Sequence, residues 1–480
     1  MIRTTYIGHA CLLIQSRDCT LLSDPVWFDP HWEEINVLCP SIILDLEKVP
    51  QVDILNISHI HMDHFDVRTL AYLRNSKILS PDVRVFAPDD DTMLEILREL
   101  DYKEIEIVEA FEPKKIKDIT LTFTPSVLPE GEPPEHGFLV NDGEVTIWNQ
   151  VDSVVTPPII QYIHKLYNQL DLAHVRFETL LEGNFTFNQP LKLPFVEYHS
   201  FLKMVKMLSP KFILPGSAAF RYSDEFGFLN SVSFPTSPQQ FLADLEEYCP
   251  EVKVSSFVHG DVAEISRQGV KILPQSSDFV RVNKNDKSVV EFKPVAEIPS
   301  IRTLTQDKAA HEEQRQEVIK FVEEELVDRL LAHRMAEVWR HWKVSYQLEV
   351  FGFQGCSDIW TIDFAKEPKA QRYRTGRINL YEAIACSELY GLIQKKTNWD
   401  FIGGSAQYRT FHNVYKVENG IFNYYPQENA FPQPLREIFP NDREMKIEQF
   451  MKDVRRWKNK TGTANNEITE TSLAEEGEND

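Results

Sequence analysis

DILNISHIHMDHFD, residues 53–66, is the stretch that decides how this chain folds. A short apolar run ends at Ser58, and the next six residues supply His59, His61, Asp63 and His64. Imidazole and carboxylate are the ligands that borderline divalent metals prefer. The alternative is a polar loop in which histidines cluster by accident, but the whole chain has only 14 His, which makes such a cluster a strong signal. The stretch therefore predicts a metal site.

The spacing of these residues predicts two metal ions. Alternate residues of an extended segment share a face, so His59 and His61 can reach one ion. A turn that begins at Met62 would direct Asp63 and His64 toward a second ion. In dinuclear sites the metals lie about 3.5–4 Å apart, a distance that one short loop can span.

Strands alternate with helices on both sides of the motif. We expect strands over residues 3–15, 19–24, 53–57, 83–87, 105–108, 119–123, 138–140 and 145–148, and helices over 67–73 and 92–100. This alternation indicates a layered domain of mixed α and β structure over residues 1–285.

The pattern changes near residue 286, and a second domain follows. Residues 286–305 are polar and interrupted by Pro, which is typical of a linker. Residues 306–458 then predict a smaller α+β domain, with a helix over 306–334, strands over 345–352 and 359–364, and a helix over 380–394. Residues 459–480 contain hardly any apolar side chain and predict a disordered acidic tail.

Composition restricts the possible partners and the compartment. Lys+Arg is 51 and Asp+Glu is 73, so the net charge is −22, which argues against a nucleic-acid partner. No apolar run approaches the ~18–20 residues that span a bilayer, and the N-terminus resembles a strand rather than a signal peptide. The six Cys form no CxxC pair, so we expect reduced thiols and a cytoplasmic protein.

The HxHxDH run resembles the signature of the metallo-β-lactamase superfamily. YIGHACLLI followed by LLSDP is similar to the opening of its UlaG-like members. The resemblance implies an αββα sandwich, and it implies a bridging Asp after a later strand. In EVTIWNQVD that residue is Asp152, whose two oxygens could each bind one metal. The alternative role of Asp152 is to cap a turn.

The third His of this family is missing from its usual place. The strand ITLTFTPS is followed by the loop VLPEGEPPEHG, in which we choose Glu130 as the ligand over Glu132, Glu135 and His136. A carboxylate in place of an imidazole favours iron or manganese over zinc. The last family ligand would be His259 in VSSFVHGDV, and the alternative for this residue is an ordinary surface turn.

Longer stretches resemble the catalytic region of the CMP-N-acetylneuraminate hydroxylase family. The similar stretches include GHACLLIQ, SDPVWFDP, ISHIHMDHFDVRTL, TIWNQVDSVVTPP and, near the C-terminus, RINLYEAIACSELYGLI, and the resemblance covers residues 5–415. That family has an N-terminal Rieske domain with Cys-x-His and Cys-x-x-His ligand pairs, which this chain does not contain. The resemblance therefore implies a separate ferredoxin or Rieske-type reductase. A dinuclear-iron β-hydroxylase branch of the superfamily uses Glu in place of the third His, which favours Glu130.

Three further residues are expected near the site. His9 in IGHA and Asp24 in SDP lie at strand ends, where they could support the ligand imidazoles or serve only the strands. Arg221 could pair with an anionic substrate or form an ordinary surface ion pair.

In the second domain the aromatic residues predict a core, with a sterol-carrier-like ligand groove as the alternative. We expect a fragment from about residue 300 to fold alone without metal, because His333 and His341 lack partners at ligand spacing.

These observations lead to one favoured function and two alternatives. The favoured function is an iron-dependent oxygenase that oxidises a polar metabolite at a two-metal centre, in which we expect Asp63 and Asp152 to be catalytic. The first alternative is a hydrolase of an ester, amide or phosphodiester that uses zinc or manganese. The second is a binding protein that has kept the fold and lost the chemistry. The absence of GxSxG and GxxxxGK[ST] motifs gives no support to a serine hydrolase or a P-loop NTPase.

Overall fold

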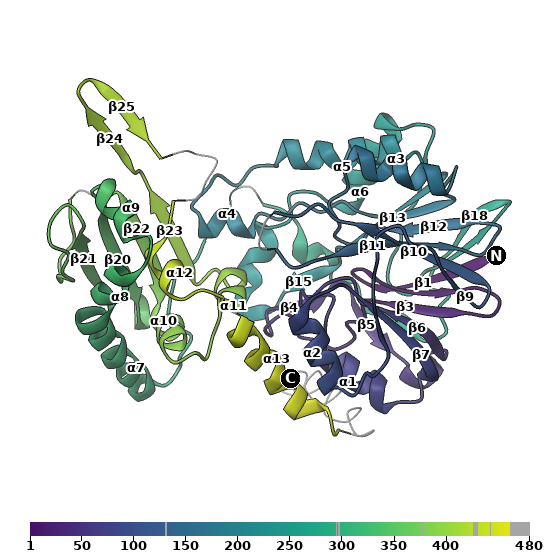
Figure 1. The fold of residues 1–480 in the computed structure, drawn as a ribbon, viewed down its shortest axis with the longest axis horizontal. Coiled ribbons are helices and arrows are strands. Elements are labelled where there is room, and N and C mark those ends of the chain that lie inside the picture. The colour runs from purple at the N-terminus through teal and green to yellow at the C-terminus, as the bar shows by residue number, and fades with distance from the viewer. Residues whose placement is uncertain are drawn as a thin grey trace, which may run out of the picture. The chain divides into compact units, whose positions relative to one another are not determined.

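A computed structural model describes residues 1–460 except 130–131, 294, 296–297, 377, 426–430 and 442. It separates into two units, each assembled from segments that are not contiguous in the chain (Figure 1). Unit 1 contains Met1–Thr179, Leu193–Phe292 and the chain from Lys446 onward, and unit 2 contains Leu180–Lys192 and Lys293–Met445. Of the expected acidic tail, residues 461–480 lie outside the described residues.

Unit 1 is built on two large sheets. The first has the strand order β18 (Gly269–Leu273), β17 (Val262–Ser266), β1 (Ile2–Gly8), β2 (Cys11–Gln15), β3 (Thr20–Ser23), β6 (Val52–Asn56), β7 (Leu79–Ala87) and β8 (Ile105–Ile107). The strands from β18 to β3 pair antiparallel, and β3, β6, β7 and β8 run parallel. The histidine-rich motif thus begins at the carboxyl end of a parallel strand inside the sheet.

The second sheet of unit 1 also mixes both kinds of pairing. Its order is β16 (Lys253–Val254), β14 (Phe212–Gly216), β13 (Leu172–Arg176), β12 (Thr146–Asn149), β11 (His136–Asn141), β10 (Ile119–Pro125) and β9 (Lys114–Ile116). The strands from β12 to β16 are parallel, and those from β9 to β12 are antiparallel. Asp152 follows the carboxyl end of β12.

Alternating side chains of the two sheets form three apolar layers. Between the sheets, Tyr6, Leu21 and Ile54 of the first sheet pack with Phe123 and Phe138 of the second. The outer face of the first sheet packs on α1 (Val67–Asn75), α2 (Asp91–Glu99) and the end of α13 (Arg443–Trp457), and the outer face of the second packs on α3 (Pro157–Leu166), α5 (Phe195–Leu208) and α6 (Pro238–Tyr248). In Figure 1, α1 and α2 lie on one side of the sheets and α3 and α5 on the other. The αββα sandwich expected from the sequence is therefore confirmed.

Smaller elements complete the edge of unit 1. Two strand pairs are present, β4 (Asn36–Leu38) with β15 (Phe220–Tyr222) and β5 (Ser41–Leu44) with β19 (Val280–Lys284). Short 3-10 turns lie at η1 (Leu46–Lys48), η2 (Asp224–Ser231) and η3 (Lys287–Val290). The β4–β15 pair places residues 218–220 beside the turn between β1 and β2, where Ser217 N donates to His9 O at 3.3 Å.

Unit 2 is built on a single four-stranded mixed sheet with helices. Its strand order is β21 (Ser357–Asp363), β20 (Ser345–Phe351), β22 (Leu380–Ala385) and β23 (Tyr408–His412). One face packs on α7 (Lys308–Lys320), its π-helical continuation (Phe321–Glu325), α8 (Leu326–Ala332) and α10 (Cys386–Ile393). The remaining elements are α4 (Glu182–Thr186), α9 (Ala336–His341), η5 (Phe353–Gly355), α11 (Trp399–Gly404), α12 (Pro434–Ile438) and the hairpin of β24 (Tyr415–Glu418) and β25 (Ile421–Tyr424).

The helix predicted over residues 380–394 is wrong for its first part. Leu380–Ala385 is the strand β22, which pairs parallel with β20 and antiparallel with β23, and only Cys386–Ile393 is helical. The sequence LYEAIA is acceptable to either structure locally. Pairing on both sides decides for the strand, because central strands are selected by burial more than by propensity.

The last helix belongs to unit 1, although its sequence lies within the range expected for the second domain. Phe450 and Val454 of α13 are buried in the core that contains α1, and the ring of Phe450 meets that of Phe65 edge-on at 5.4 Å. Phe65 directly follows His64. A helix near the C-terminus thus packs behind the histidine-rich motif.

Candidate metal centre

The histidine-rich motif forms the loop between β6 and α1. After Asn56 the chain makes a tight turn in which the amides of His64 and Phe65 donate to the carbonyl oxygen of His61, at 2.9 and 2.8 Å. This turn folds the second half of the motif over the first, so that the ring centroids of His59 and His64 lie 4.1 Å apart. The structure therefore gathers the four side chains of the motif in one place.

His59 and His61 direct ring nitrogens at each other. Nε2 of His59 lies 3.0 Å from Nδ1 of His61, and the His59 side chain is fully buried. On the other edge of the His59 ring, Nδ1 lies 2.9 Å from the hydroxyl of Ser58. Two ring nitrogens at this spacing can share one cation, and a partner on the far nitrogen is how proteins orient a metal-binding imidazole.

Asp152 reaches the motif from the second sheet. The preceding residue, Val151, has φ of +57°. Left-handed backbone at a β-branched residue costs about 1–3 kcal/mol and is found mostly at functional sites. Arg176 donates to the carbonyl oxygen of Asp152 at 2.7 Å, and Oδ2 of Asp152 lies 3.3 Å from Nε2 of His64. The strained turn thus holds the carboxylate against the motif.

His9, which was expected only near the ligands, is in direct contact with two residues of the motif. Its Nε2 is 3.0 Å from Nε2 of His64 and 3.1 Å from Oδ2 of Asp63. One donor atom from each of His9, Asp63, His64 and Asp152 lies within 4.8 Å of the others. The side chains of this four-residue cluster come from three separate parts of unit 1.

Asp24 stands behind the motif. Its Oδ1 accepts a hydrogen bond from the amide of Ser58 at 2.7 Å, and its Oδ2 lies 3.4 Å from Nδ1 of His64. A fully buried carboxylate on this side of the ring favours the tautomer of His64 that carries its proton on Nδ1. The lone pair of Nε2 then faces Asp63 and Asp152.

His259 is buried beside the turn that carries His9. Its Nδ1 lies 2.9 Å from the carbonyl oxygen of Pro40, and this carbonyl can only accept, so Nδ1 carries the proton. Nε2 is buried and has no hydrogen-bond partner among the described residues. A Cβ on Gly8 would lie 3.5 Å from this nitrogen. His259 therefore has the tautomer of a metal ligand, but it lies outside the four-residue cluster.

The acidic loop is described only in part. Glu130, the residue chosen from the sequence, lies outside the described residues. Of its alternatives, Glu132 is exposed, and Glu135 accepts from the hydroxyl of Ser126 at 2.5 Å. Burial raises the pKa of Glu135, and the negative charge of Asp152 adds to the effect.

His136 and Arg221 are engaged elsewhere. Nε2 of His136 lies 3.0 Å from Oδ1 of Asn56, on the β6 side of the motif. Arg221 on β15 donates to Oδ2 of Asp286 at 3.0 Å, so its guanidinium takes part in an ion pair.

The charges of the cluster attract a cation. Burial lowers the pKa of His59 well below its ordinary value, and the imidazoles of His64 and His61 lower it further. Burial alone would also lower the pKa of His64, but Asp63 and Asp152 outweigh burial and hold that pKa well above its ordinary value. In turn, His64 keeps the pKa of both carboxyl groups below the usual range against the effect of burial. The site thus presents two carboxylates that favour ionisation, and their negative charge favours a positive charge beside them.

Two residues that sequence reasoning missed come from the neighbouring strand β13 and the chain just after it. His174 donates through Nδ1 to Oδ1 of Asn149 at 3.0 Å, and its Nε2 is buried without a partner among the described residues. Glu178 follows the strand, and burial, together with the charge of Asp152, raises its pKa to about 8. The signal was available, since the carboxyl ends of adjacent parallel strands meet at one edge of a sheet.

The donor set fits divalent metal ions. Imidazole nitrogens and carboxylate oxygens converge in a buried place, and Nε2 of His259 is an orphaned buried acceptor nearby. Such donors suit zinc, iron and manganese. His59 and His61 would hold one ion, Asp63 and His64 the other, and Asp152 has an oxygen for each.

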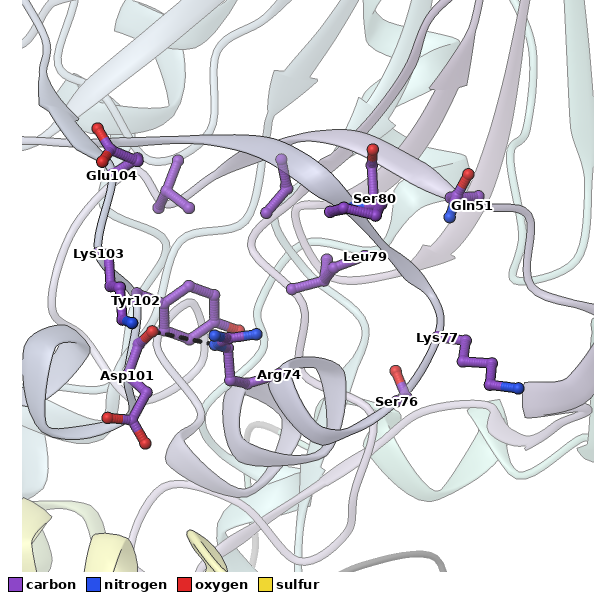
Figure 2. Close-up of a pocket in the computed structure, with 13 residues that line it drawn as sticks. Gln51, Arg74, Ser76, Lys77, Leu79, Ser80, Asp101, Tyr102, Lys103 and Glu104 are labelled. Carbon is purple, nitrogen blue, oxygen red and sulfur yellow. Dashed lines mark hydrogen bonds between the residues drawn. The ribbon is translucent and has the colours of Figure 1, made fainter.

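A separate cavity of about 500 Å³ lies at the outer edge of the first sheet (Figure 2). It is lined by residues of α1, β7 and the segment before β8, and Figure 2 shows Arg74 bonded to the main chain of Asp101 beside the ring of Tyr102. None of its lining residues belongs to the cluster. It is therefore distinct from the candidate metal centre.

Known proteins match parts of this chain. A Rieske 2Fe-2S iron-sulfur protein, so named, from Mycolicibacterium smegmatis is 27% identical over 199 residues, which are 40% of this chain and 37% of that protein. A cytidine monophosphate-N-acetylneuraminic acid hydroxylase from Asterias rubens is 29% identical over 89 residues, 18% of this chain and 13% of that protein. An N-acyl-phosphatidylethanolamine-hydrolyzing phospholipase D from Caenorhabditis elegans is 30% identical over 88 residues, 18% of this chain and 24% of that protein. The chain thus spans well under two thirds of the length of these relatives.

Solved structures share the fold at low similarity. A diiron beta-hydroxylase from Streptomyces venezuelae is 17% identical, covers 57% of this chain and 54% of its own, and aligns with a TM-score of 0.38. A metallo hydrolase from Ignicoccus hospitalis is also 17% identical, covers 54% and 97%, and has the same TM-score of 0.38. Similarity of this degree does not decide between the reactions of these two proteins.

The helices and the cysteines bear on the expectations about membranes and disulfides. None of the described helices combines the length and the apolar composition needed to cross a lipid bilayer. All six cysteines are free, and all but Cys356 are buried.

The family model described as "Beta-lactamase superfamily domain" matches residues 3–148, the part of unit 1 that contains β1, the histidine-rich motif and β12. Together with the αββα sandwich, this match over less than a third of the chain shows that unit 1 has the metallo-β-lactamase fold.

Proposed function

We propose that this protein is an enzyme with two metal ions in unit 1, and that it is an iron-dependent oxygenase of a polar small molecule. The observation that supports a metal centre is the meeting of Asp152 with the motif, at 3.3 Å between its Oδ2 and Nε2 of His64. The strained turn before Asp152 and the histidine-rich motif lie far apart in the sequence, yet they bring donor atoms together in a buried place.

The ligand arrangement follows from the two halves of the motif. His59, His61 and Asp152 hold the first ion together with a carboxylate of the acidic loop, for which Glu130 remains our choice. Asp63, His64 and Asp152 hold the second ion, and His259 stands near it. When bound, a pair of irons supplies the electrons and the Lewis acidity that O₂ activation requires.

The protein's own groups orient and charge the site. Asp24 fixes the ring of His64, and Arg176 fixes the main chain of Asp152. Burial raises the pKa of Glu178 to about 8, so this acid can keep a proton near Asp152 at neutral pH, and burial also raises the pKa of Glu135. A polar substrate suits this surrounding better than an apolar one.

Two features support an oxygenase rather than a hydrolase. The acidic loop offers carboxylates where hydrolases of this superfamily have a histidine, and carboxylates favour iron over zinc. Relatives over part of the chain bear the names of a Rieske protein and of a hydroxylase. The electron donor would be a separate ferredoxin or Rieske-type reductase.

A metal-dependent hydrolase is the second candidate. A relative that is 30% identical over 88 residues is named as a hydrolysing phospholipase. In a hydrolase the same two ions would be zinc or manganese and would activate water.

Elemental analysis of protein purified without added metal separates the candidates. We expect about two irons per chain, together with O₂ consumption that depends on an added reductant. His61→Ala should lose at least one metal equivalent, whereas His199→Ala, an exposed histidine on α5, should keep both. Protein that contains only zinc and cleaves esters or phosphodiesters without O₂ would contradict the oxygenase and favour the hydrolase.

A further inference from the structure

The turn between β1 and β2 fixes the side chain of His9. His9 has φ of +47°, a left-handed conformation, and its carbonyl oxygen accepts from Ser217 N at 3.3 Å. Nδ1 of the ring lies 3.0 Å from the carbonyl oxygen of Ala218. The backbone and one ring nitrogen are thus hydrogen-bonded to the segment that leads into β15. His9 as a whole is 5% exposed.

These contacts determine which nitrogen of His9 carries the proton. A carbonyl oxygen only accepts, so Nδ1 donates to Ala218 and Nε2 of the neutral ring has a free lone pair. That lone pair faces Nε2 of His64 at 3.0 Å and Oδ2 of Asp63 at 3.1 Å. In His64, Asp24 sets the same tautomer, so the lone pair of its Nε2 faces back.

Four electron-pair donors therefore face one another in a buried space. They are Nε2 of His9, Nε2 of His64 and one oxygen each of Asp63 and Asp152. Two negative charges and two ring nitrogens at these distances favour a positive charge among them. One shared proton would neutralise a single charge and satisfy two donors, whereas a divalent cation neutralises both carboxylates and accepts all four lone pairs.

The spacing of the donors is that of a tetrahedral shell. Ligands about 2.0–2.1 Å from a metal at tetrahedral angles lie about 3.3–3.4 Å apart. The distances along the cluster are 3.0 Å from His9 to His64, 3.1 Å from His9 to Asp63, 3.3 Å from His64 to Asp152 and 3.8 Å from His64 to Asp63. These four distances lie near the tetrahedral value, and all the donor atoms are within 4.8 Å of one another.

From these distances and tautomers, we propose that His9 is a direct ligand of the metal that Asp63 and His64 bind. This inference rests on the two-metal centre proposed above and assigns it a ligand from outside the histidine-rich motif. It makes the second metal shell complete in the four-residue cluster alone.

Metal content of three matched variants tests this assignment. His9→Asn is the informative change, because Asn can donate from Nδ2 to Ala218, accepts a left-handed φ and lacks the Nε2 atom. His9→Gln, which can offer an oxygen near the position of Nε2, should restore part of the binding. Leu245→Ala removes a buried apolar side chain of α6 in unit 1, outside the cluster, and serves as the control for a general loss of stability.

We expect wild type and Leu245→Ala to bind two metal equivalents and His9→Asn to bind one. Loss of a ligand should weaken the second site by more than the roughly 10- to 100-fold that loss of a supporting residue costs. In the Co²⁺-loaded proteins, the visible absorption of the second site should disappear in His9→Asn while that of the first remains. Circular dichroism confirms that each variant is folded.

Two outcomes would overturn the assignment and are distinct from failure of the proposed function. If His9→Asn keeps two equivalents with affinities within about 10-fold of wild type, His9 only positions Asp63 and is no ligand. If His9→Asn and Leu245→Ala lose metal equally while folded, the loss reflects reduced stability and not the ligand. A wild-type protein that binds no metal would instead contradict the two-metal enzyme itself.

Discussion

Single side chains decide which metal this centre selects, and Glu130 is the most informative of them. If Glu130 completes the shell of the ion held by His59 and His61, Glu130→Ala should lose iron and O₂-dependent turnover together. Glu132→Ala, which changes an exposed side chain of the same loop, should keep both. Iron content and O₂ consumption of the two variants check this prediction.

Glu135 is the competing residue in that loop. It lies near enough to Asp152 for the two charges to interact, and its bond to Ser126 engages one of its two carboxylate oxygens. We expect Glu135→Ala to keep its iron, as Glu132→Ala does. Full iron in Glu130→Ala with loss in Glu135→Ala would move the ligand five residues along the chain and leave the fold assignment intact.

Gly216, at the end of β14, controls the position of Asp152 from a distance. A Cβ at this position would lie 1.9 Å from Cε1 of His174, so Gly216→Ala must displace that ring. His174 bonds to Oδ1 of Asn149, which also accepts from the amide of Val151, and the strained turn before Asp152 would lose this support.

We expect Gly216→Ala to lower the free energy of unfolding by about 1–3 kcal/mol, as overpacking does, and to reduce metal content. Gly227→Ala is the control, because its nearest neighbour lies 3.9 Å from the added carbon. Thermal unfolding with parallel metal analysis checks both. An unchanged metal content in a destabilised Gly216→Ala would show that His174 does not support the turn.

Glu382 should make the stability of unit 2 depend on pH. It is fully buried on β22, and burial raises its pKa to about 7, although Tyr408 and the amide of Leu435 donate to it. Because the pKa in the folded state lies above the ordinary value of 4.5, the protonated group stabilises the fold fully below about pH 4.5. This contribution is lost as the pH rises through about 7.

Wild type should therefore lose up to about 3 kcal/mol of unfolding free energy between pH 4.5 and pH 8 from this group. Glu382→Gln, which stays neutral, should show a flatter dependence, and Glu313→Gln on the exposed face of α7 should behave as wild type. Urea denaturation followed by circular dichroism at pH 5, 6.5 and 8 measures the difference. Equal slopes in wild type and Glu382→Gln would contradict the assigned role.

At the scale of elements, α13 is the unexpected support of the metal loop. Phe450 packs on Phe65, the residue after His64, and is 6% exposed. Phe450→Ala should cost about 3–5 kcal/mol, the usual range for a buried Phe, and should weaken metal binding because the motif loses its backing. Lys452→Ala, on the exposed side of the same helix, should change neither property. Denaturant titration and metal affinity measured on both variants test this.

Local patterns predicted the elements well where the sequence itself carried the decisive information. The run from Ser58 to His64 indicated a metal loop because its ligands are close in sequence, and the alternation of strands and helices indicated the sandwich. Where pairing partners decide, the sequence was ambiguous. LYEAIA was assigned to a helix because its central position between β20 and β23 depends on residues far along the chain.

The position of His9 at the centre was not predictable for the same reason. Its neighbours are Ala218, at a separation of 209 residues, and His64, at a separation of 55. A Gly-His pair after a strand signals a turn, and only the assembled sheets show that the turn faces the motif. Asp24 was easier to anticipate, because it ends the strand next to β6.

At the scale of the whole molecule, the chain passes between the two units more than once. Residues 180–192, which interrupt unit 1 in sequence, belong to unit 2, where Arg409 lies over the ring of Phe185 and Arg436 over that of Phe187, at 5.8 and 5.7 Å. Chain order suggested a clean boundary near residue 286. Contacts between residues far apart in sequence produce a different division.

This division changes the expectation for an isolated second domain. A fragment of residues 293–445 lacks α4 and would expose the faces that Phe185 and Phe187 cover, so it should unfold at a lower temperature than the same fragment joined to residues 180–192 by a Gly/Ser linker. Neither fragment should bind stoichiometric metal. Thermal melts and elemental analysis decide, and equal melting temperatures would show that α4 contributes nothing to unit 2.

The placement of α13 also affects the order of events during synthesis. A ribosome completes β1, the histidine-rich motif and both large sheets long before it reaches Phe450 and Val454, because domains form from the N-terminus as the chain emerges. Until then the outer face of α1 has no cover, and the nascent sandwich carries an exposed apolar stripe that a chaperone could recognise. Maturation of the metal loop would accordingly be a late, post-translational event, and premature termination before α13 would yield a product marked for degradation rather than a shorter active enzyme.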